Sequence, residues 1–439
     1  MRATALTTLR QLAHRALRRA LALLPVERRF ALYRRLVDCQ PRPSGALVVK
    51  VAETAEELEA CFRILHDAYV GNGFMPPHPS GLRVTPWHAL PTTTTVCAKV
   101  GGEVVGTLSM VRAGVFGLPL QSAFDLSRVR ARPGKVAEIS ALAVRKDFRR
   151  TGGAILFPLM KFMYEYCTRY FDTRHLLIAV NPNKIEMYES LLLFERLSAR
   201  PVDHYAFANG AAAVGAWLDL ADAPARYETL YAGQPPQRDL YAYFVETTLP
   251  QLQLPPRPYF TTNDPVMTPA LLDEFFNKRT QVFDTLTARQ RQLLRGVYHG
   301  PAYRDVLPPA DADPAPEQPL RGSQRHSIRC PGWFVAADQS VARARLPLHL
   351  LEISHGGCRV TLESQTLVKG TRGELQVTLG PGRTSRVQVR VVRRAGPAAW
   401  GLAVEASDLA WRRCVDTLEG SQTYRELSTP PVVEAACAA

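Results

Sequence analysis

The sequence predicts an α+β protein of several domains: a mixed α/β sheet with helices on both faces, a helical middle region and a C-terminal six-stranded β-barrel. Two observations support this fold class. Residues 136–188 have the pattern of strand, glycine loop, helix, strand and helix, which is a βαβ-type unit. After residue 330, six short segments alternate apolar and polar residues between Gly and Pro turns, a pattern typical of a small barrel.

Composition limits the class of protein. A chain of 439 residues suggests two or three domains, at about 150 residues each. The eight cysteines are scattered and form no C-x-x-C pair. We therefore expect a protein of the reducing cytoplasm, with no disulfide framework and no metal site. No apolar run reaches the ~18 residues of a membrane-spanning helix.

The net charge of +14 is concentrated at the two ends of the chain. Residues 1–42 hold ten Arg against two acids, or +8, and residues 321–426 hold fifteen Arg and one Lys against nine acids, or +7. Such ends favour acidic partners: a carrier protein, an anionic lipid or an anionic nucleotide. We expect no nucleic acid polymer among them.

The N-terminal arm allows two interpretations. Its leucines recur at helical spacing and its arginines lie largely on other faces. It could be a peripheral anchor on an anionic membrane surface, which would place a cytoplasmic protein on the inner membrane face. Alternatively, it is a helical hairpin packed on its own protein, with the arginines facing solvent.

A proline-rich segment and a change in the pattern of apolar residues predict the domain boundaries. Six prolines between residues 301 and 319 mark a linker, and the patterns on either side differ. We expect the following division: a basic helical arm (1–42), the α/β core (43–205), a helical extension (206–300), a Pro-rich linker (301–320), the barrel domain (321–426) and a tail (427–439).

Within the α/β core, one run carries the candidate chemistry. The predicted strand 136–144 places Glu138 and Ser140 on one face, because side chains alternate along a strand. A carboxylate in this apolar strand would have a raised pKa and could accept a proton from an ammonium group. The alternative is an edge carboxylate that faces water.

A glycine loop follows this strand and precedes a helix-length apolar stretch. Arg149, Gly152 and Ala154 have the spacing R-x-x-G-x-A. Glycines at a helix start let the backbone approach an anion, and the free N–H groups there favour phosphate. Further on, Tyr188 follows Asn181 by seven residues, after a second apolar strand.

Together these motifs resemble the GNAT acetyltransferase superfamily, and the AEISALAV strand resembles the N-acyl amino acid synthases within it. Those synthases are related to the acyl-homoserine-lactone synthases, which usually carry Arg where this chain has Ala141. The resemblance implies that the loop holds the phosphate of an acyl thioester donor, on acyl carrier protein or CoA. The donor-binding residues it implies are Arg149, Arg150, Gly152, Gly153, Ala154 and Asn181.

The resemblance also implies a reaction. An amino acid amine would attack the thioester carbonyl, with Glu138, Ser140 and Tyr188 as the catalytic residues. Glu138 would take the amine proton, a backbone N–H near strand 136–144 would polarise the carbonyl, and Tyr188 would protonate the thiolate. A tyrosine that only packs in the core is an equal alternative for Tyr188.

A second pair of motifs lies at the start of the predicted barrel. Arg325 and Arg329 are spaced R-x-x-x-R, and 352–357 is spaced E-x-S-x-x-G. This pair resembles the PilZ domain and implies that the regulatory ligand is cyclic di-GMP, whose phosphates and guanine edges suit arginine forks. The implied binding residues are Arg325, Arg329, Glu352, Ser354 and Gly357.

Two details bear on this second site. The family prefers Asp or Asn where this chain has Glu352, so its carboxylate lies one methylene further out. Because the linker precedes the arginines, we expect them to be mobile until the ligand orders residues 321–330. A degenerate barrel used only for protein contacts is the alternative.

The expected function is therefore an acyltransferase that forms N-acyl amino acids under cyclic di-GMP control. An acyl-CoA-dependent N-acetyltransferase and a non-catalytic cyclic di-GMP effector scaffold are the rival hypotheses. A wide apolar tunnel would argue against the first, and a blocked cleft around Glu138 would favour the second.

Overall fold

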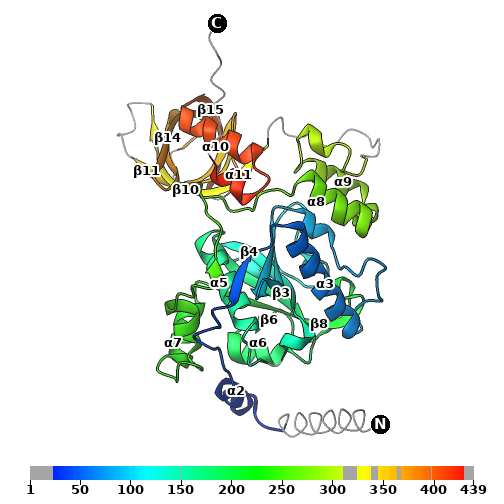
Figure 1. The fold of residues 1–439 in the computed structure, drawn as a ribbon. Helices are drawn as coiled ribbons and strands as arrows, with labels where there is room; N and C mark the ends of the chain where they lie inside the picture. Colours follow the sequence, from blue (N-terminus) through cyan, green and yellow to red (C-terminus); the bar gives the residue numbers. More distant parts are fainter. Residues whose placement is uncertain are drawn as a thin grey trace.

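A computed structural model describes residues 23–149, 151–309, 324–337, 345–362, 367–396 and 398–429 of the chain. It has two lobes, a large mixed sheet with its helices and a barrel, which lie one above the other in Figure 1. The predicted α/β sheet and six-stranded barrel are both confirmed.

The nine-stranded sheet has the order β6-β8-β5-β4-β3-β2-β1-β9, with β7 paired to β8. Its strands run antiparallel except at β4–β5 and β1–β9. Val100 and Glu103 pair at the end of the β2–β3 hairpin, so the hairpin around Gly101-Gly102 forms as predicted. The strands are β1 (Leu47–Val51), β2 (Thr93–Val100), β3 (Glu103–Arg112), β4 (Lys135–Val144), β5 (Thr173–Val180), β6 (Glu195–Arg196), β7 (Val202–Tyr205), β8 (Ala211–Asp219) and β9 (Leu252–Gln253).

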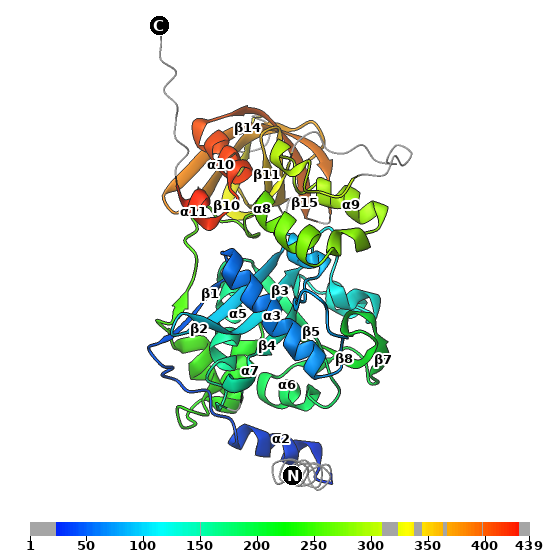
Figure 2. The same ribbon diagram turned by 45° about the vertical axis from the view of Figure 1, so that its right-hand side comes forward.

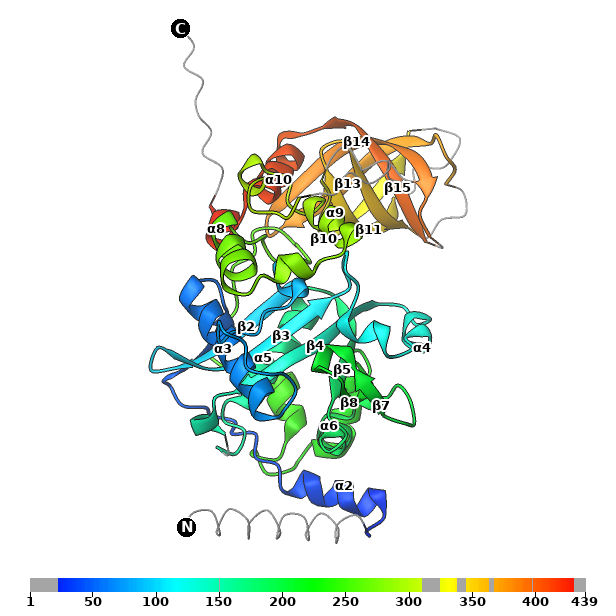
Figure 3. The same cartoon turned by 90° about the vertical axis from the view of Figure 1, so that its right-hand side faces the viewer.

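Helices cover both faces of this sheet (Figure 3). Alternation along β2 shows how: Val96 and Ala98 belong to the core beneath helix α5, whereas Cys97 belongs to the core beneath helix α3. Helix α3 begins at a Thr54 cap, whose side chain accepts the Glu57 N–H. The helices of this lobe are α2 (Val26–Arg35), α3 (Ala55–Gly71), α4 (Ser127–Arg130), α5 (Leu156–Arg169), α6 (Ile185–Leu192) and α7 (Ala223–Tyr231).

The core extends beyond residue 205, where we expected the helical extension to begin. Residues 211–219 form strand β8, which pairs with β5 and β6 inside the sheet. The segment AAAVGAWLD contains a single β-branched residue, so its strand state depends on two sheet neighbours more than on propensity.

The helical middle region packs on the α3 face. Helix α8 (Pro269–Leu272) continues as the π-helical segment η6 (Asp273–Arg279), and α9 (Ala288–Arg295) follows. Phe275 packs edge-on against Phe62 of α3, with ring centroids 5.3 Å apart. Figure 2 shows α8 and α9 between the sheet and the barrel. Residues 301–309 still belong to this fold, with Tyr303 buried. The rest of the expected linker, residues 310–320, lies outside the described part of the chain.

The barrel closes in the order β10-β11-β12-β15-β14-β13. The apolar side chains of its strands and of α10 form one buried core. Its elements are β10 (His326–Ala336), β11 (Leu346–Ser354), β12 (Gly357–Leu362), β13 (Arg372–Gly380), β14 (Arg383–Arg394), β15 (Ala399–Ser407), α10 (Leu409–Gly420) and α11 (Tyr424–Ser428).

A buried polar cluster joins the two lobes. At its centre the Asp264 carboxylate accepts hydrogen bonds from Arg257 Nη2 and Tyr166 Oη, both at 3.0 Å. Arg112 Nη2 lies 3.5 Å away, and the hydroxyl of Tyr424, after the barrel, also donates to this carboxylate. Asp264 therefore neutralises the charges of Arg112, in β3, and of Arg257, in the segment after β9. It also anchors α11 through the hydroxyl of Tyr424.

The N-terminal arm is described only from residue 23. Helix α2 docks on α6, where Arg29 donates to both carboxylate oxygens of Glu186 at 3.1 and 2.7 Å. This part of the arm packs on its own protein, as one of the two interpretations expected. No helix in the described part of the chain is long and apolar enough to cross a membrane.

Removing the Asp264 side chain should destabilise the protein strongly. Asp264→Ala leaves two buried guanidinium groups without their carboxylate, and breaking a buried pair in this way costs about 3–5 kcal/mol. We expect a clear fall in the urea midpoint and the melting temperature.

The matched control is Asp305→Ala, which removes an exposed carboxylate and should change neither value appreciably. Equal midpoints for the two variants would show that the cluster contributes nothing to stability.

Candidate functional site

Strand β4 separates from β5 halfway along its length. The two strands pair from Lys135 to Ile139, but β5 continues beside β8 to Val180. On its other edge, β4 has two residues, Ala141 and Leu142, opposite a single β3 residue. This is a β-bulge, and Ala141 adopts φ +54° there. The bulge and the split leave an opening in the middle of the sheet.

A pocket occupies this opening. Its empty volume is about 460 Å³, part of which is open to solvent. Small apolar side chains make up much of its wall, which leaves room for a substrate. The lining residues are Tyr69, Phe74, Glu138, Ser140, Ala141, Ala179, Val180, Asn181, Tyr205, Phe207, Ala208, Ala211, Ala212 and Ala213.

Glu138 is the buried acid of the pocket. Glu138 is 1% exposed, and its Oε2 accepts the Leu120 N–H at 2.9 Å. Burial raises the pKa of Glu138 to about 8, although the Leu120 hydrogen bond acts in the opposite direction. A carboxyl group with this pKa can exchange a proton near neutral pH, as a general base must.

Ser140 lines the same pocket, as alternation along the strand predicts. Asn181 also lines it, at the end of β5, and its Oδ1 accepts the Asn183 N–H at 2.9 Å. The structure therefore brings together three of the residues that the sequence singled out.

Tyr205 is a pocket residue that the sequence analysis missed. It is 2% exposed, and its hydroxyl has no hydrogen-bond partner among the described residues. Burial raises the pKa of Tyr205 far above its usual range, and the neighbouring Glu138 adds to this effect. No motif surrounds Tyr205 in the sequence; only its place at the end of β7, beside β8, brings it to the pocket.

Tyr188 lies elsewhere. It is in α6, partly buried, with its ring perpendicular to Phe194 at 6.0 Å between centroids. Burial raises the pKa of Tyr188 to about 12. It is absent from the pocket wall, so the structure does not bring it together with Glu138.

The glycine loop has the backbone that its sequence predicts. Gly152 and Gly153 adopt φ +61° and +86°, which disfavours residues with a Cβ. A Cβ on Gly153 would also lie 2.5 Å from the Phe157 ring. Exposed Arg149 donates to Val144 O at 2.7 Å, Ala154 N–H bonds to Thr151 O, and Arg150 is outside the described residues.

This loop leads directly into α5, which has no side-chain cap. Pro158 has no N–H, and Phe157 and Leu159 donate theirs to Gly153 O and Ile155 O. The N–H groups left for an anion are therefore among those before Phe157. The chain after α2 lies against the loop, with Gln40 Nε2 donating to Thr151 O at 3.2 Å. The N-terminal arm thus borders the expected phosphate site.

At the barrel, both motif arginines are engaged. Arg325 Nη1 donates to Glu352 at 3.2 Å, and Arg359 Nη2 lies 2.9 Å from the other oxygen of the same carboxylate. Arg329 forms an ion pair with Asp172, which precedes β5 in the other lobe. An acidic residue of the sheet lobe thus holds one of the two arginines that were predicted to bind the ligand.

We expected these arginines to be mobile before a ligand binds; the structure gives residues 324–330 specific contacts, and residues 321–323 are outside the described part of the chain. Strand β10 begins at His326, inside the motif, and pairs with β11. Thr262 N–H bonds to Ser327 O at 2.9 Å, and Arg329 N–H bonds to Phe260 O at 2.8 Å. Backbone contacts with residues 260–262, far away in sequence, therefore order the motif.

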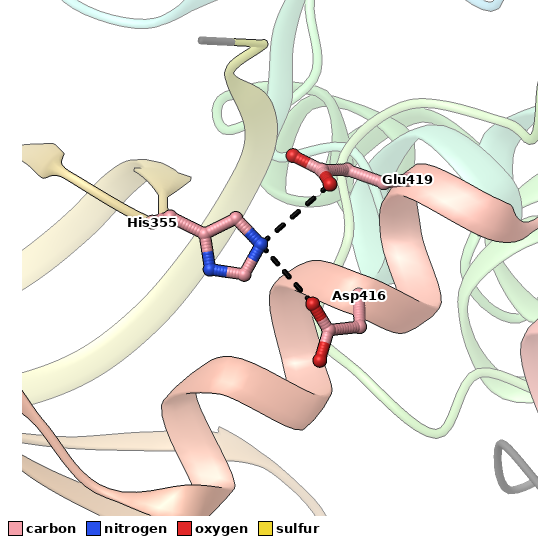
Figure 4. A group of neighbouring side chains, drawn as sticks. All are labelled: His355, Asp416 and Glu419. Atoms are coloured by element: carbon pink, nitrogen blue, oxygen red, sulfur yellow. Dashed lines mark ion pairs between the residues drawn. The ribbon is translucent and has the colours of Figure 1, made fainter. Parts of the chain in front are cut away.

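The second barrel motif forms the β11–β12 turn. Buried Ser354 donates to Gly357 O at 2.8 Å, and a Cβ on Gly357 would lie 3.0 Å from Leu402 O. In Figure 4, His355 of this turn faces α10, with Nε2 3.1 Å from Asp416 and 3.6 Å from Glu419. These three exposed groups are of the types that bind divalent cations, and direct polar contacts between the imidazole and the two carboxylates explain the same geometry.

Comparison with known proteins gives a match for each of the two lobes of the chain. Residues 60–219 match the sequence model of the N-acyl amino acid synthase FeeM family, and residues 320–410 match that of the PilZ domain. Residues 60–219 thus resemble an N-acyl amino acid synthase, and residues 320–410 resemble a PilZ domain. A search of curated proteins finds no match.

Solved structures that match part of this chain include three proteins. FeeM, an N-acyl amino acid synthase from uncultured soil microbes, is 25% identical, with a TM-score of 0.35 over 42% of this chain and 94% of that one. The CoA-dependent acyl-homoserine lactone synthase BjaI is 19% identical, with a TM-score of 0.35 over 48% and 95%. Escherichia coli ElaA is 12% identical, with a TM-score of 0.28 over 39% and 99%.

Glu138 should make folding stability depend on pH in a specific direction. Its pKa in the folded state, about 8, is above the ordinary value of 4.5, so the folded protein retains a proton that the unfolded chain loses. The stabilisation is complete below about pH 4.5 and is lost as pH rises through 8. Because Glu138→Gln cannot titrate, its melting temperature relative to wild type should increase between pH 5 and pH 9.

The exposed carboxylate of Glu246 supplies the control, and Glu246→Gln should show a constant difference across this range. A constant difference for Glu138→Gln as well would mean that its carboxyl ionises normally in the folded protein.

Proposed function

We propose that this protein joins a fatty acyl group to the amine of an amino acid, and that cyclic di-GMP bound to the barrel regulates the reaction. The observation that carries the proposal is Glu138: a buried carboxyl with a raised pKa, in a pocket where β4 and β5 separate, inside the region that matches the synthase family. The open pocket also argues against a scaffold with a blocked cleft.

The donor would be a fatty acyl thioester of acyl carrier protein or CoA. Both carry a pantetheine arm with a phosphate, which suits the N–H groups before Phe157 and the loop residues Arg149 to Ala154. The arm would then extend along the split between β4 and β5. This places the thioester carbonyl near the bulge at Ala141.

The reaction would proceed by direct attack of the acceptor nitrogen on the thioester carbon. Glu138 takes a proton from the ammonium group, and the freed lone pair forms the C–N bond. The carbonyl oxygen gains negative charge, which a backbone N–H at the Ala141 bulge would stabilise. The C–S bond then breaks, and the nitrogen loses its second proton to water, which gives a neutral amide and a thiolate.

Tyr188 remains the proposed proton donor to this thiolate, which would have to leave toward α6 to reach it. Thiols have an ordinary pKa of about 8.5, so the thiolate leaves readily near neutral pH. We therefore expect Tyr188 to matter much less than Glu138.

Regulation would act through the ion pair between Arg329 and Asp172. A dianionic nucleotide on the barrel competes with Asp172 for the same guanidinium group, because arginine forks bind phosphate strongly. Binding would exchange a contact between the lobes for a contact with the ligand. The arrangement of the lobes would then shift toward the one that the ligand binds better.

Glu138→Gln should nearly abolish acyl transfer. Gln keeps the shape and can still accept the Leu120 N–H, but it cannot take a proton, so turnover should fall by roughly 10²–10⁴. The assay combines the purified full chain with a palmitoyl thioester of acyl carrier protein or CoA and mixed amino acids, and detects the amide by mass spectrometry. Wild-type turnover by this variant would remove Glu138 as the base.

Cyclic di-GMP should bind the full chain with micromolar or tighter affinity. Arg325→Ala and Arg329→Ala should each cost about 2–3 kcal/mol, the value of a charge-assisted bond. Asp172→Asn should tighten binding, because it frees Arg329 without changing the barrel. Calorimetry on each variant measures these differences.

The control is Asp222→Asn, which removes an exposed acid from the same lobe and should leave the affinity unchanged. Absence of heat, together with no competition for a labelled nucleotide, would leave only the degenerate-barrel hypothesis. Weaker binding to Asp172→Asn would contradict the competition.

A further inference from the structure

We propose that Arg83 binds the carboxylate of the acceptor, so that the enzyme selects α-amino acids over amines that lack an acidic group. The inference rests on the proposed acyl transfer and names the substrate class of the same pocket. Arg83 stands in no motif of the sequence, and only its contacts in the folded protein point to this role.

Arg83 is outside the pocket lining, but it contacts two aromatic residues that line the pocket. Its guanidinium carbon is 3.8 Å from the ring centroid of Tyr69 and 5.2 Å from that of Phe207. Its charge also acts on the hydroxyl of Tyr205, which lines the pocket beside Glu138. A positive charge therefore acts on Tyr205, a pocket residue next to Glu138.

This charge has no acidic partner in the described part of the chain. Arg83 Nη2 donates to Phe207 O at 2.8 Å, and Nη1 lies 4.0 Å from Met75 Sδ. Neither contact neutralises the guanidinium. Arg63, by comparison, has its carboxylate at 2.5 Å, on Glu59. A half-buried cation without a counter-ion is costly, and an anionic substrate would remove that cost.

The stacking geometry suits carboxylate recognition. The guanidinium carbon lies over the Tyr69 ring, and the N–H donors of a guanidinium point outward in its own plane. Contacts with both rings restrict the side chain, so little rotamer freedom remains to be lost on binding. A carboxylate can approach the free edge and accept two parallel N–H bonds.

The chemistry of the acceptor completes the argument. An α-amino acid carries its ammonium group and its carboxylate on the same carbon atom. A site that binds both groups therefore needs a proton acceptor and a cation near each other. Glu138 supplies the acceptor and Arg83 the cation. An amine without a carboxylate would meet only Glu138, and it would leave Arg83 unpaired in the closed complex.

The test compares matched acceptors on the full-length enzyme. We would measure kcat/KM for leucine against 3-methylbutylamine, and for phenylalanine against 2-phenylethylamine, with palmitoyl-CoA and with palmitoyl acyl carrier protein. Wild type should prefer each amino acid. Arg83→Met should lower kcat/KM for the amino acids by about 10- to 100-fold, the size expected for a charge-assisted hydrogen bond, mainly through KM, and should leave the amines nearly unchanged.

Two further variants separate recognition from structure. Arg83→Lys keeps the charge but not the planar fork, so it should restore only part of the preference. Arg226→Met removes a surface arginine that is paired with Glu195 and should match wild type with every acceptor.

The outcomes distinguish this inference from the proposed function. If wild type acylates the amines as well as the amino acids, acyl transfer stands and the role of Arg83 is refuted. If Arg83→Met loses both acceptor classes equally, Arg83 only holds the pocket wall, which also refutes the inference. If neither class is acylated by wild type, the proposed function fails, and the inference fails with it.

Discussion

The bulge at Ala141 is the constraint on which the candidate active site depends. One extra residue in β4 breaks the register with β3, while β4 stops pairing with β5 after Ile139. A continuous sheet would bury this region between α3 and α5 and leave no space for a substrate. Because β4 leaves the ladder here, Glu138 can be buried among apolar groups and still face an open pocket. The raised pKa of Glu138 and the open pocket beside it thus have one structural origin.

The same strand also reaches the interface between the lobes. Lys135, at the start of β4, donates to Thr262 Oγ1 at 3.2 Å, in the segment whose backbone holds the R-x-x-x-R motif. Burial lowers the pKa of Lys135 to about 8, and the charge of Arg329 adds to this effect. Glu138 is three residues further, roughly 10 Å along an extended strand. A nucleotide that draws Arg329 away from Asp172 would therefore change the charges around one end of the strand that carries the base.

Local patterns predicted most of the fold and only part of the site. Alternation and glycine turns are local signals, so the β2–β3 hairpin, strand β4 and the six barrel strands follow from the sequence. Strand β8 does not, because its alanine-rich segment becomes a strand only between two neighbours. Glu138 and Ser140 belong to one motif and were predicted together. Tyr205, Arg83 and the Arg329–Asp172 pair come from segments that meet only in the folded chain, and no spacing rule relates them.

The pKa of Glu138 limits how regulation can work. With a pKa of about 8, most of these carboxyl groups are protonated at pH 7. A rearrangement that admitted water would lower the pKa of Glu138 and raise the ionised fraction. The gain in rate would be limited, since a carboxylate with a lower pKa is also a weaker base. A larger effect would have to come from the position of β4 relative to a bound thioester, because small displacements of reacting groups change rates strongly.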